Sequence, residues 1–128
     1  MPNIIGLGLD ATDIPRIADT IARYGDRFLN RIFTEREVAY SMRRRQPAIH
    51  FAGRFAAKEA ILKALGTGWR GKIAWTDIEI SNDAAGAPAV ALSGECARIA
   101  ARLGIERILL SITHTDHYAA ASAIGIAV

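Results

Sequence analysis

The chain has 128 residues, of which 51% are hydrophobic and 23% are charged, a composition that fits one domain and excludes intrinsic disorder. It contains no window of about 18 uncharged apolar residues, so we expect no membrane span. The formal net charge is +3, but residues 1–72 carry 13 Lys and Arg against 7 Asp and Glu, whereas residues 73–128 carry 3 against 6. This asymmetry indicates an anionic partner for the N-terminal half: nucleic acid, a phosphate-rich cofactor or an acidic protein.

The N-terminus and the cysteine content favour a cytoplasmic protein. Met1–Asp10 lack a basic segment followed by an apolar one, and the single Cys96 can form no internal disulfide. Nothing in the sequence therefore points to secretion, and we expect a cytoplasmic location. One cysteine also excludes a zinc–cysteine cluster.

The first half of the chain predicts a strand followed by helices. Asn3–Leu9 is short and rich in branched residues, which predicts a buried strand that ends at Asp10. Asp13 as an N-cap, with proline in the first turn, predicts a helix that stops at Gly25.

Two further helices are predicted before the middle of the chain. Thr34 and Glu37 fit a capping box for a helix that runs to about residue 45. Ala48–Leu65 is the longest helical pattern, and Gly66 is expected to end it in a left-handed conformation. A glycine-rich loop over residues 66–71 follows.

The second half predicts mostly strands. The expected order is strand Ile73–Ser81, turn 82–88, strand Ala89–Leu92, helix Glu95–Leu103 ended by Gly104, and two strands, Arg107–Thr115 and Tyr118–Val128, joined by a tight turn. Hairpin-linked strands with scattered helices favour an α+β fold over a doubly wound parallel sheet. Residues 1–128 show no repeat or linker, so we expect a single domain.

Asp10 is the first candidate for chemistry. Positions 6, 8 and 10 share one face of a strand, so Gly6 and Gly8 leave space on the side to which Asp10 points. A ligand or another backbone could fill that space. Asp10 is therefore a candidate metal ligand, and the alternative is that it caps the next helix.

The helix around Phe55 carries dense charge in otherwise apolar sequence. Arg54 and Lys58 are four residues apart, as are Glu59 and Lys63, so they form two neighbouring rows. Mg²⁺ prefers one or two carboxylates together with phosphate oxygens and water, and nearby cations neutralise the remaining phosphate charge. These four residues and Asp10 have that composition. The alternative is an exposed helix with an ordinary Glu–Lys pair.

Other apparent motifs carry less weight. Residues 66–71 spell GxGxxG, but they follow a predicted helix instead of a strand, so the context of a dinucleotide fingerprint is missing. His114 and His117 would point to opposite faces, which disfavours zinc binding by that pair. Arg43–Arg45 could contact nucleic acid, but three basic residues at a helix end are also typical of a solvated terminus.

Three blocks of sequence together resemble the holo-[acyl-carrier-protein] synthase family, the small bacterial 4′-phosphopantetheinyl transferases. The blocks are Gly6-Leu-Gly-Leu-Asp10, Arg54-Phe-Ala-Ala-Lys58-Glu59-Ala-Ile-Leu-Lys63-Ala and Ser111-Ile-Thr-His114-Thr. Their order, their spacing and the chain length agree with the family, and the resemblance covers essentially the whole chain.

The resemblance implies a Mg²⁺-dependent enzyme. It would move 4′-phosphopantetheine from coenzyme A to a serine of apo acyl carrier protein, release adenosine 3′,5′-bisphosphate and support fatty acid biosynthesis. The implied fold is α+β, with mostly antiparallel sheet packed with helices. The implied assembly is a homotrimer with active sites between subunits.

The resemblance also implies roles for individual residues. Asp10 and Glu59 would bind the metal, and Glu59 and Lys63 would be catalytic, with Lys63 against the pyrophosphate. The residues expected to bind the cofactor are Arg54, Lys58, Lys63, Gly66, Gly68 and His114. Those expected to dock acyl carrier protein are Arg16, Arg23 and Phe28, with Arg27 nearby.

Some alternatives stay open at the level of the sequence. The base that accepts the serine proton could be Glu59, a metal-bound water or a group near Asp116. The same basic helix and glycine loop could serve a non-catalytic module that binds coenzyme A or a nucleotide. A nucleic-acid binder that uses Arg43–Arg45 is the third hypothesis, although we expect neither a nucleic-acid nor a membrane partner.

Overall fold

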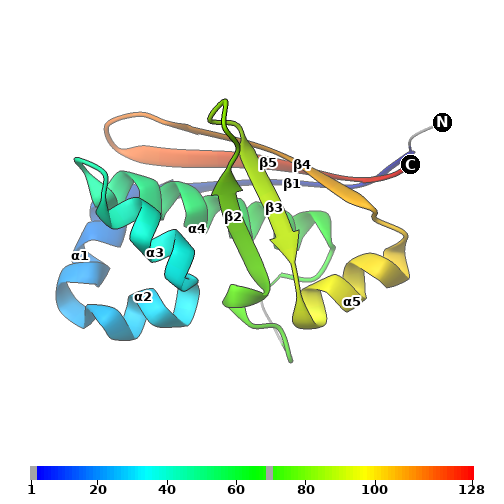
Figure 1. Cartoon of the computed structure of the whole chain (residues 1–128), viewed down its shortest axis with the longest axis horizontal. Coiled ribbons are helices and arrows are strands. Elements are labelled where there is room, and N and C mark those ends of the chain that lie inside the picture. The colour runs from blue at the N-terminus through cyan, green and yellow to red at the C-terminus, as the bar shows by residue number, and fades with distance from the viewer. Residues whose placement is uncertain (1–2, 69–70) are drawn as a thin grey trace.

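The computed structural model describes residues 3–68 and 71–128, which form two antiparallel sheets packed with helices (Figure 1). The elements are β1 (Asn3–Asp13), α1 (Ile14–Tyr24), α2 (Asp26–Ile32), α3 (Glu35–Met42), α4 (Pro47–Ala64), η1 (Trp75–Asp77), β2 (Ile78–Asn82), β3 (Pro88–Leu92), α5 (Gly94–Leu103), β4 (Arg107–His114) and β5 (Tyr118–Ala127). The α+β class is confirmed. No helix in these two stretches is long and apolar enough to cross a bilayer.

The larger sheet has the strand order β1-β5-β4. Its central strand β5 pairs antiparallel with β1 from Asn3 to Asp13. The prediction that the first strand ends at Asp10 is wrong, because β5 still offers paired backbone to Asp10 at Ala121 and continues to Tyr118. Asp10 therefore lies within the strand, on a rigid backbone.

The cap signals in the sequence are confirmed for α1 and α3. The Asp13 carboxylate accepts a hydrogen bond from the Arg16 amide at 3.1 Å, and Gly25 ends α1 at a φ of 55°. Thr34 and Glu37 form the capping box of α3, with distances of 2.8 and 3.3 Å between each side chain and the other residue's amide. The short helix α2 was not predicted, and α3 ends at Met42 instead of near residue 45.

The longest helix, α4, runs along the larger sheet, with α1, α2 and α3 at one end of the molecule and α5 at the other (Figure 1). Gly6 and Gly8 of β1 let the helix lie directly on the strand, because a Cβ at either position would overlap the carbonyl oxygen of Ala64 or Ala60. Of the two occupants that the sequence allowed for this space, the structure shows another backbone. Asp10, on the same face of β1, is thereby brought against α4.

We expect Gly8→Ala to lower the free energy of unfolding by about 1–3 kcal/mol or more, because the added methyl group pushes α4 away from β1. Thermal and urea unfolding measure the loss. Ala11→Ser, at an exposed position of the same strand, is the control. A Gly8→Ala protein with unchanged stability would show that the helix does not depend on this close contact.

The smaller sheet is the hairpin of β2 and β3. The sequence predicted a strand from Ile73, but the structure has the 3₁₀ turn η1 over Trp75–Asp77 and a strand that begins at Ile78. The Asp77 carboxylate accepts a hydrogen bond from the Ala74 amide at 3.2 Å, which stabilises the turn in competition with strand pairing. The predicted strand at 89–92 and the predicted helix at 95–103 are confirmed within one residue.

Candidate functional site

Asp10, Glu59 and Lys63 lie together where β1 meets α4. The Lys63 ammonium donates hydrogen bonds to Asp10 Oδ1 at 3.1 Å and to the Leu9 carbonyl at 2.9 Å. The Asp10 side chain is 13% exposed and that of Lys63 is 53% exposed. Thr12 donates to the second carboxylate oxygen of Asp10 at 3.4 Å. The cluster thus has a fixed carboxylate and a cation that can still reach an incoming ligand.

Glu59 is half-buried beside Asp10. Burial, the charge of Asp10 and a hydrogen bond with Asp10 raise the pKa of Glu59, and the positive charge of Lys63 partly opposes them. Two carboxylates in contact beside a single ammonium form a site that is short of positive charge. A cation placed between the carboxylates would relieve this repulsion.

The donor set fits Mg²⁺. This ion is commonly held by one or two carboxylates, and its remaining positions are filled by water and phosphate oxygens. Residues 3–68 and 71–128 contain no group of three or more His, Cys, Asp or Glu that could hold a metal by themselves. Asp10 and Glu59 would therefore hold the ion only in part, and oxygens of substrate and water would have to complete the shell.

A cavity of about 600 Å³ opens beside Glu59. Its wall includes Arg16 of α1, Phe28 of α2 and Phe55 of α4. Two of the residues expected to dock acyl carrier protein, Arg16 and Phe28, thus line the same space as Glu59. Arg23 is exposed in the last turn of α1, and its spacing of seven from Arg16 places both arginines on one side of the helix.

Arg54 lies on a different side of α4. Glu59 follows it by five residues, which is roughly 140° around a helix, and Lys63 is on the opposite side altogether. Arg54 is 4% exposed and donates from Nη2 to Asn82 Oδ1 at 2.9 Å. His114, at the end of β4, acts electrostatically on His50, which Arg54 also faces. Arg54 and His114 thus both lie near His50, and Arg54 projects from a different side of α4 than Glu59 and Lys63.

The prediction that Lys58 binds the cofactor is wrong. Its side chain is fully buried, and Nζ lies 2.8 Å from Glu37 Oε1. Nζ also lies 2.8, 3.1 and 2.7 Å from the carbonyl oxygens of Ile32, Trp75 and Ile78, respectively. Burial lowers the pKa of Lys58, and Glu37 opposes the shift. These acceptors occupy the ammonium inside the protein, where no cofactor reaches it.

The glycine loop begins one turn after Lys63. The Gly66 amide donates to the Lys63 carbonyl at 2.9 Å, and Gly66 and Gly68 have φ values of 75° and 62°. The left-handed end of α4 at Gly66 is confirmed, and these angles explain why glycine stands at both positions. Two residues of the predicted loop, 69 and 70, lie outside the described residues.

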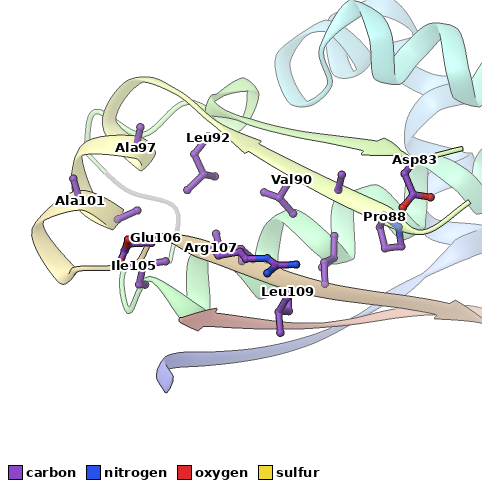
Figure 2. Close-up of a pocket in the computed structure, with 14 residues that line it drawn as sticks. Asp83, Pro88, Val90, Leu92, Ala97, Ala101, Ile105, Glu106, Arg107 and Leu109 are labelled. Atoms are coloured by element: carbon purple, nitrogen blue, oxygen red, sulfur yellow. The ribbon is translucent and has the colours of Figure 1, made fainter. Parts of the chain in front are cut away.

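A second cavity, of about 640 Å³, lies between β3, α5 and β4 (Figure 2). Val90 and Leu92 of β3, Ala97 of α5 and Leu109 of β4 surround it. None of the site residues expected from the sequence lines this space.

Sequence reasoning missed Tyr40 and His50 beside Arg54, and it considered Arg44 only as part of the basic run Arg43–Arg45. The Arg44 and Arg54 guanidinium carbons lie 3.9 and 4.0 Å from the centre of the Tyr40 ring, and the His50 ring centre lies 5.9 Å from it. Tyr40 and Arg44 are four residues apart, and so are His50 and Arg54, a spacing that could have revealed each pair. It could not show that the two pairs meet.

The geometry and the comparisons with known proteins agree. The model of the 4′-phosphopantetheinyl transferase superfamily matches residues 6–123. The chain therefore belongs to this superfamily, and within it to the holo-[acyl-carrier-protein] synthases, as the sequence blocks indicated.

Individual relatives show how far the likeness extends. The holo-[acyl-carrier-protein] synthase of Protochlamydia amoebophila is 49% identical over 120 residues, which cover 94% of this chain and 96% of that protein. The crystal structure of the Neisseria meningitidis synthase matches with a TM-score of 0.88 at 32% identity and covers 96% of this chain and 98% of that chain. The Helicobacter pylori synthase, solved in complex with coenzyme A, matches with a TM-score of 0.82 at 30% identity and covers 93% of this chain and 98% of that chain.

Proposed function

We propose that the chain transfers 4′-phosphopantetheine from coenzyme A to a serine hydroxyl of apo acyl carrier protein, with adenosine 3′,5′-bisphosphate as the second product. The observation that carries the proposal is the meeting of Asp10, Glu59 and Lys63 at the junction of β1 and α4 in a chain of this family. The relatives named holo-[acyl-carrier-protein] synthase support the reaction, and a solved relative with coenzyme A bound supports the donor.

The chain's own residues supply positioning and charge. The new bond joins the serine oxygen to the β-phosphorus, the bond from that phosphorus to the bridging oxygen of the adenosine bisphosphate breaks, and the serine hydroxyl loses its proton to a base. Charge on the phosphoryl oxygens must be neutralised during this displacement. Lys63 is exposed enough to meet the pyrophosphate, and Asp10 orients its ammonium. Mg²⁺ held by Asp10 and Glu59 supplies further charge neutralisation when it is bound.

We place each active site between two subunits. Arg54 lies roughly 140° around α4 from Glu59 and on the opposite side from Lys63, so we do not expect these residues to contact one ligand within a single chain. We group His114 with Arg54, because both act on His50. A nucleotide that contacts both groups would span two copies of the chain. The carboxylates and Lys63 of one copy would then hold the pyrophosphate, and Arg54 with His114 of the neighbour would hold the remaining phosphate.

The outer face of the larger sheet supports a homotrimer. Leu7 and Leu9 of β1 are 67% and 66% exposed, and Leu109 of β4 is 43% exposed. Leu7 pairs with Ile124, which in turn pairs with Leu109, so these side chains form one apolar row across the sheet. Apolar surface of this kind marks interaction sites.

We expect Leu7→Glu to dissociate the trimer, because a carboxylate would be buried in an apolar interface. Light scattering should give three times the chain mass of 13.8 kDa for the natural chain and a lower mass for the variant. Leu103→Glu, at a leucine on α5 that is 43% exposed, is the control and should keep the mass of the natural chain. A Leu7→Glu protein that keeps the mass of the natural chain would contradict the interface.

The carrier protein would dock beside the cavity that adjoins Glu59. Arg16 and Arg23 present positive charge on one side of α1, and Phe28 adds apolar surface next to Arg16. Such a surface suits an acidic partner that carries the acceptor serine. A role in fatty acid biosynthesis and a cytoplasmic location follow from the sequence and the family alone, and they stay predictions, as does the single domain.

The direct test is the mass of apo acyl carrier protein before and after incubation with the chain, coenzyme A and Mg²⁺. We expect the mass to rise by one phosphopantetheine group and adenosine 3′,5′-bisphosphate to appear in equal amount. A module that only binds coenzyme A would leave the carrier protein unchanged, and that outcome would overturn the proposal. Omission of Mg²⁺ tests the metal requirement in the same assay.

A further inference from the structure

A sandwich of two arginines around Tyr40 forms a positively charged surface on the side of α4 that faces α3 and β2. The Arg44 and Arg54 guanidiniums lie 3.9 and 4.0 Å from the centre of the ring. Two guanidiniums cannot share one face of a ring at these distances, so each occupies its own face. Stacking of this kind stabilises a cation on an aromatic ring and fixes its orientation.

This cluster has too few acids to balance its charge. The ion pairs formed in the described part of the chain leave out Arg44 and Arg54. Arg54 is buried, with only 4% of the residue exposed, and its Nε has no hydrogen-bond partner. Glu37 is the acid that acts on Arg54, but its carboxylate oxygens already accept from Lys58 and from the Ile80 amide, at 2.8 Å each. The arginines therefore lack a counter-ion that an anionic ligand could supply.

His50 borders the same cluster. It lies on α4 four residues before Arg54, it is half-buried, and its ring meets the Tyr40 ring edge-on at 5.9 Å. Burial lowers the pKa of His50, and the charges of Arg54, Arg44 and His114 lower it further. These groups face His50 from α4, from the turn after α3 and from β4, and Tyr40 faces it from α3. His50 is consequently neutral near pH 7 in the free protein.

We propose that His50 takes up a proton when a phosphate monoester binds among Arg44, Arg54 and His114, and that His50 thereby helps the site to select a nucleotide that carries such a phosphate. The inference rests on the proposed function, which places the pyrophosphate of coenzyme A beside Lys63 and leaves its phosphate monoester for the Arg54 side of α4. A phosphate monoester carries a charge of about −1.5 to −2 near neutral pH. Burial and the repulsion from these cations keep His50 neutral, the phosphate charge offsets the repulsion, and solvent supplies the proton.

The pH dependence follows from the sign of this coupling. When the pKa of His50 is higher in the ligand-bound protein than in the free protein, protonation of His50 increases the affinity for the ligand at low pH. The gain is complete below the free pKa and is lost as the pH rises through the bound pKa. Each unit of difference between the pKa of His50 in the bound and in the free protein corresponds to about a tenfold change in affinity. The phosphate itself also titrates near pH 6. The contribution of His50 is therefore isolated by comparing the natural chain with a variant that lacks His50, both with the same ligand.

The first experiment is calorimetry of adenosine 3′,5′-bisphosphate with the full chain at pH 6.5, in two buffers that differ in heat of ionisation. We expect the natural chain to take up more protons per bound ligand than His50→Gln, and to lose more affinity between pH 6 and pH 8. His117→Gln, at an exposed position in the turn after β4, should match the natural chain. Equal proton uptake by all three proteins would overturn the inference and leave the proposed function intact. A natural chain that does not bind the bisphosphate would overturn both.

A second measurement uses the natural chain alone. The sequence has three histidines, so their ring signals can be followed by nuclear magnetic resonance and assigned with single substitutions. We expect the His50 signal to titrate below 6.5 in the free protein and at a higher pH with adenosine 3′,5′-bisphosphate bound. An unchanged midpoint would contradict the proposal even if His50→Gln failed to fold.

Discussion

Glu59→Gln is expected to reduce phosphopantetheine transfer by on the order of 10²-fold or more, because it removes one of the two carboxylates proposed to hold the metal ion that neutralises charge on the phosphate. Glutamine keeps the shape of the side chain, so the loss would reflect charge. Glu35→Gln, at an exposed position of α3, is the control and should retain activity. Full activity in Glu59→Gln would remove Glu59 from the proposed metal site.

The direction in which Glu59→Gln changes the stability of the chain can also be predicted. Burial and Asp10 raise the pKa of Glu59 in the folded chain, so the ionised carboxylate opposes folding at neutral pH when no metal is present. Glu59→Gln should therefore be at least as stable as the natural chain in metal-free buffer. Added Mg²⁺ should raise the melting temperature of the natural chain and have little effect on the variant. Equal stabilisation of both proteins by Mg²⁺ would place the metal elsewhere.

Lys58→Met should destabilise the chain by about 3–5 kcal/mol, as is typical when one partner of a buried ion pair is removed. The substitution leaves the Glu37 carboxylate buried without a cation, and it leaves the carbonyl oxygens of Ile32, Trp75 and Ile78 without their donor. Urea unfolding measures the loss. Lys72→Met, at an exposed position, is the control and should be nearly neutral.

A double-mutant cycle shows how much of this loss belongs to the unpaired charge. Glu37→Gln combined with Lys58→Met should recover part of the stability, because the glutamine carbonyl can still accept from the Thr34 amide. Recovery should be incomplete, since the three backbone carbonyl oxygens stay without a donor. Simple additivity of the two substitutions would show that the carboxylate and the ammonium do not stabilise each other.

The features that could be predicted from the sequence are those that neighbouring residues determine. Asp13 and Thr34 began helices as predicted because a cap depends on the next three residues. The shared face of Gly6, Gly8 and Asp10 follows from the period of a strand, but that period left open whether a ligand or another backbone fills the space, and the structure shows the backbone of α4. The three family blocks then identified the reaction, which the periodicity of apolar residues cannot reveal.

What failed depends on contacts between distant segments. Lys58 has the same spacing from Arg54 as Lys63 has from Glu59, and nothing local shows that one pair turns into the core and the other toward solvent. Its partners Glu37 and Ile78 come from α3 and β2, so only the folded chain reveals the buried ion pair. The end of β1 was misplaced for the same reason, because the pairing partner lies more than a hundred residues away.

The separation of Glu59 and Arg54 by helix α4 has a consequence for mixtures of intact and defective chains. If each active site combines the carboxylates of one subunit with the guanidinium of the next, a chain damaged at both positions disables its own site and that of a neighbour. Such a chain would act as a dominant inhibitor. Two inactive chains, one altered at Glu59 and the other at Arg54, would instead complement each other, since a mixed trimer contains a site in which both halves are intact.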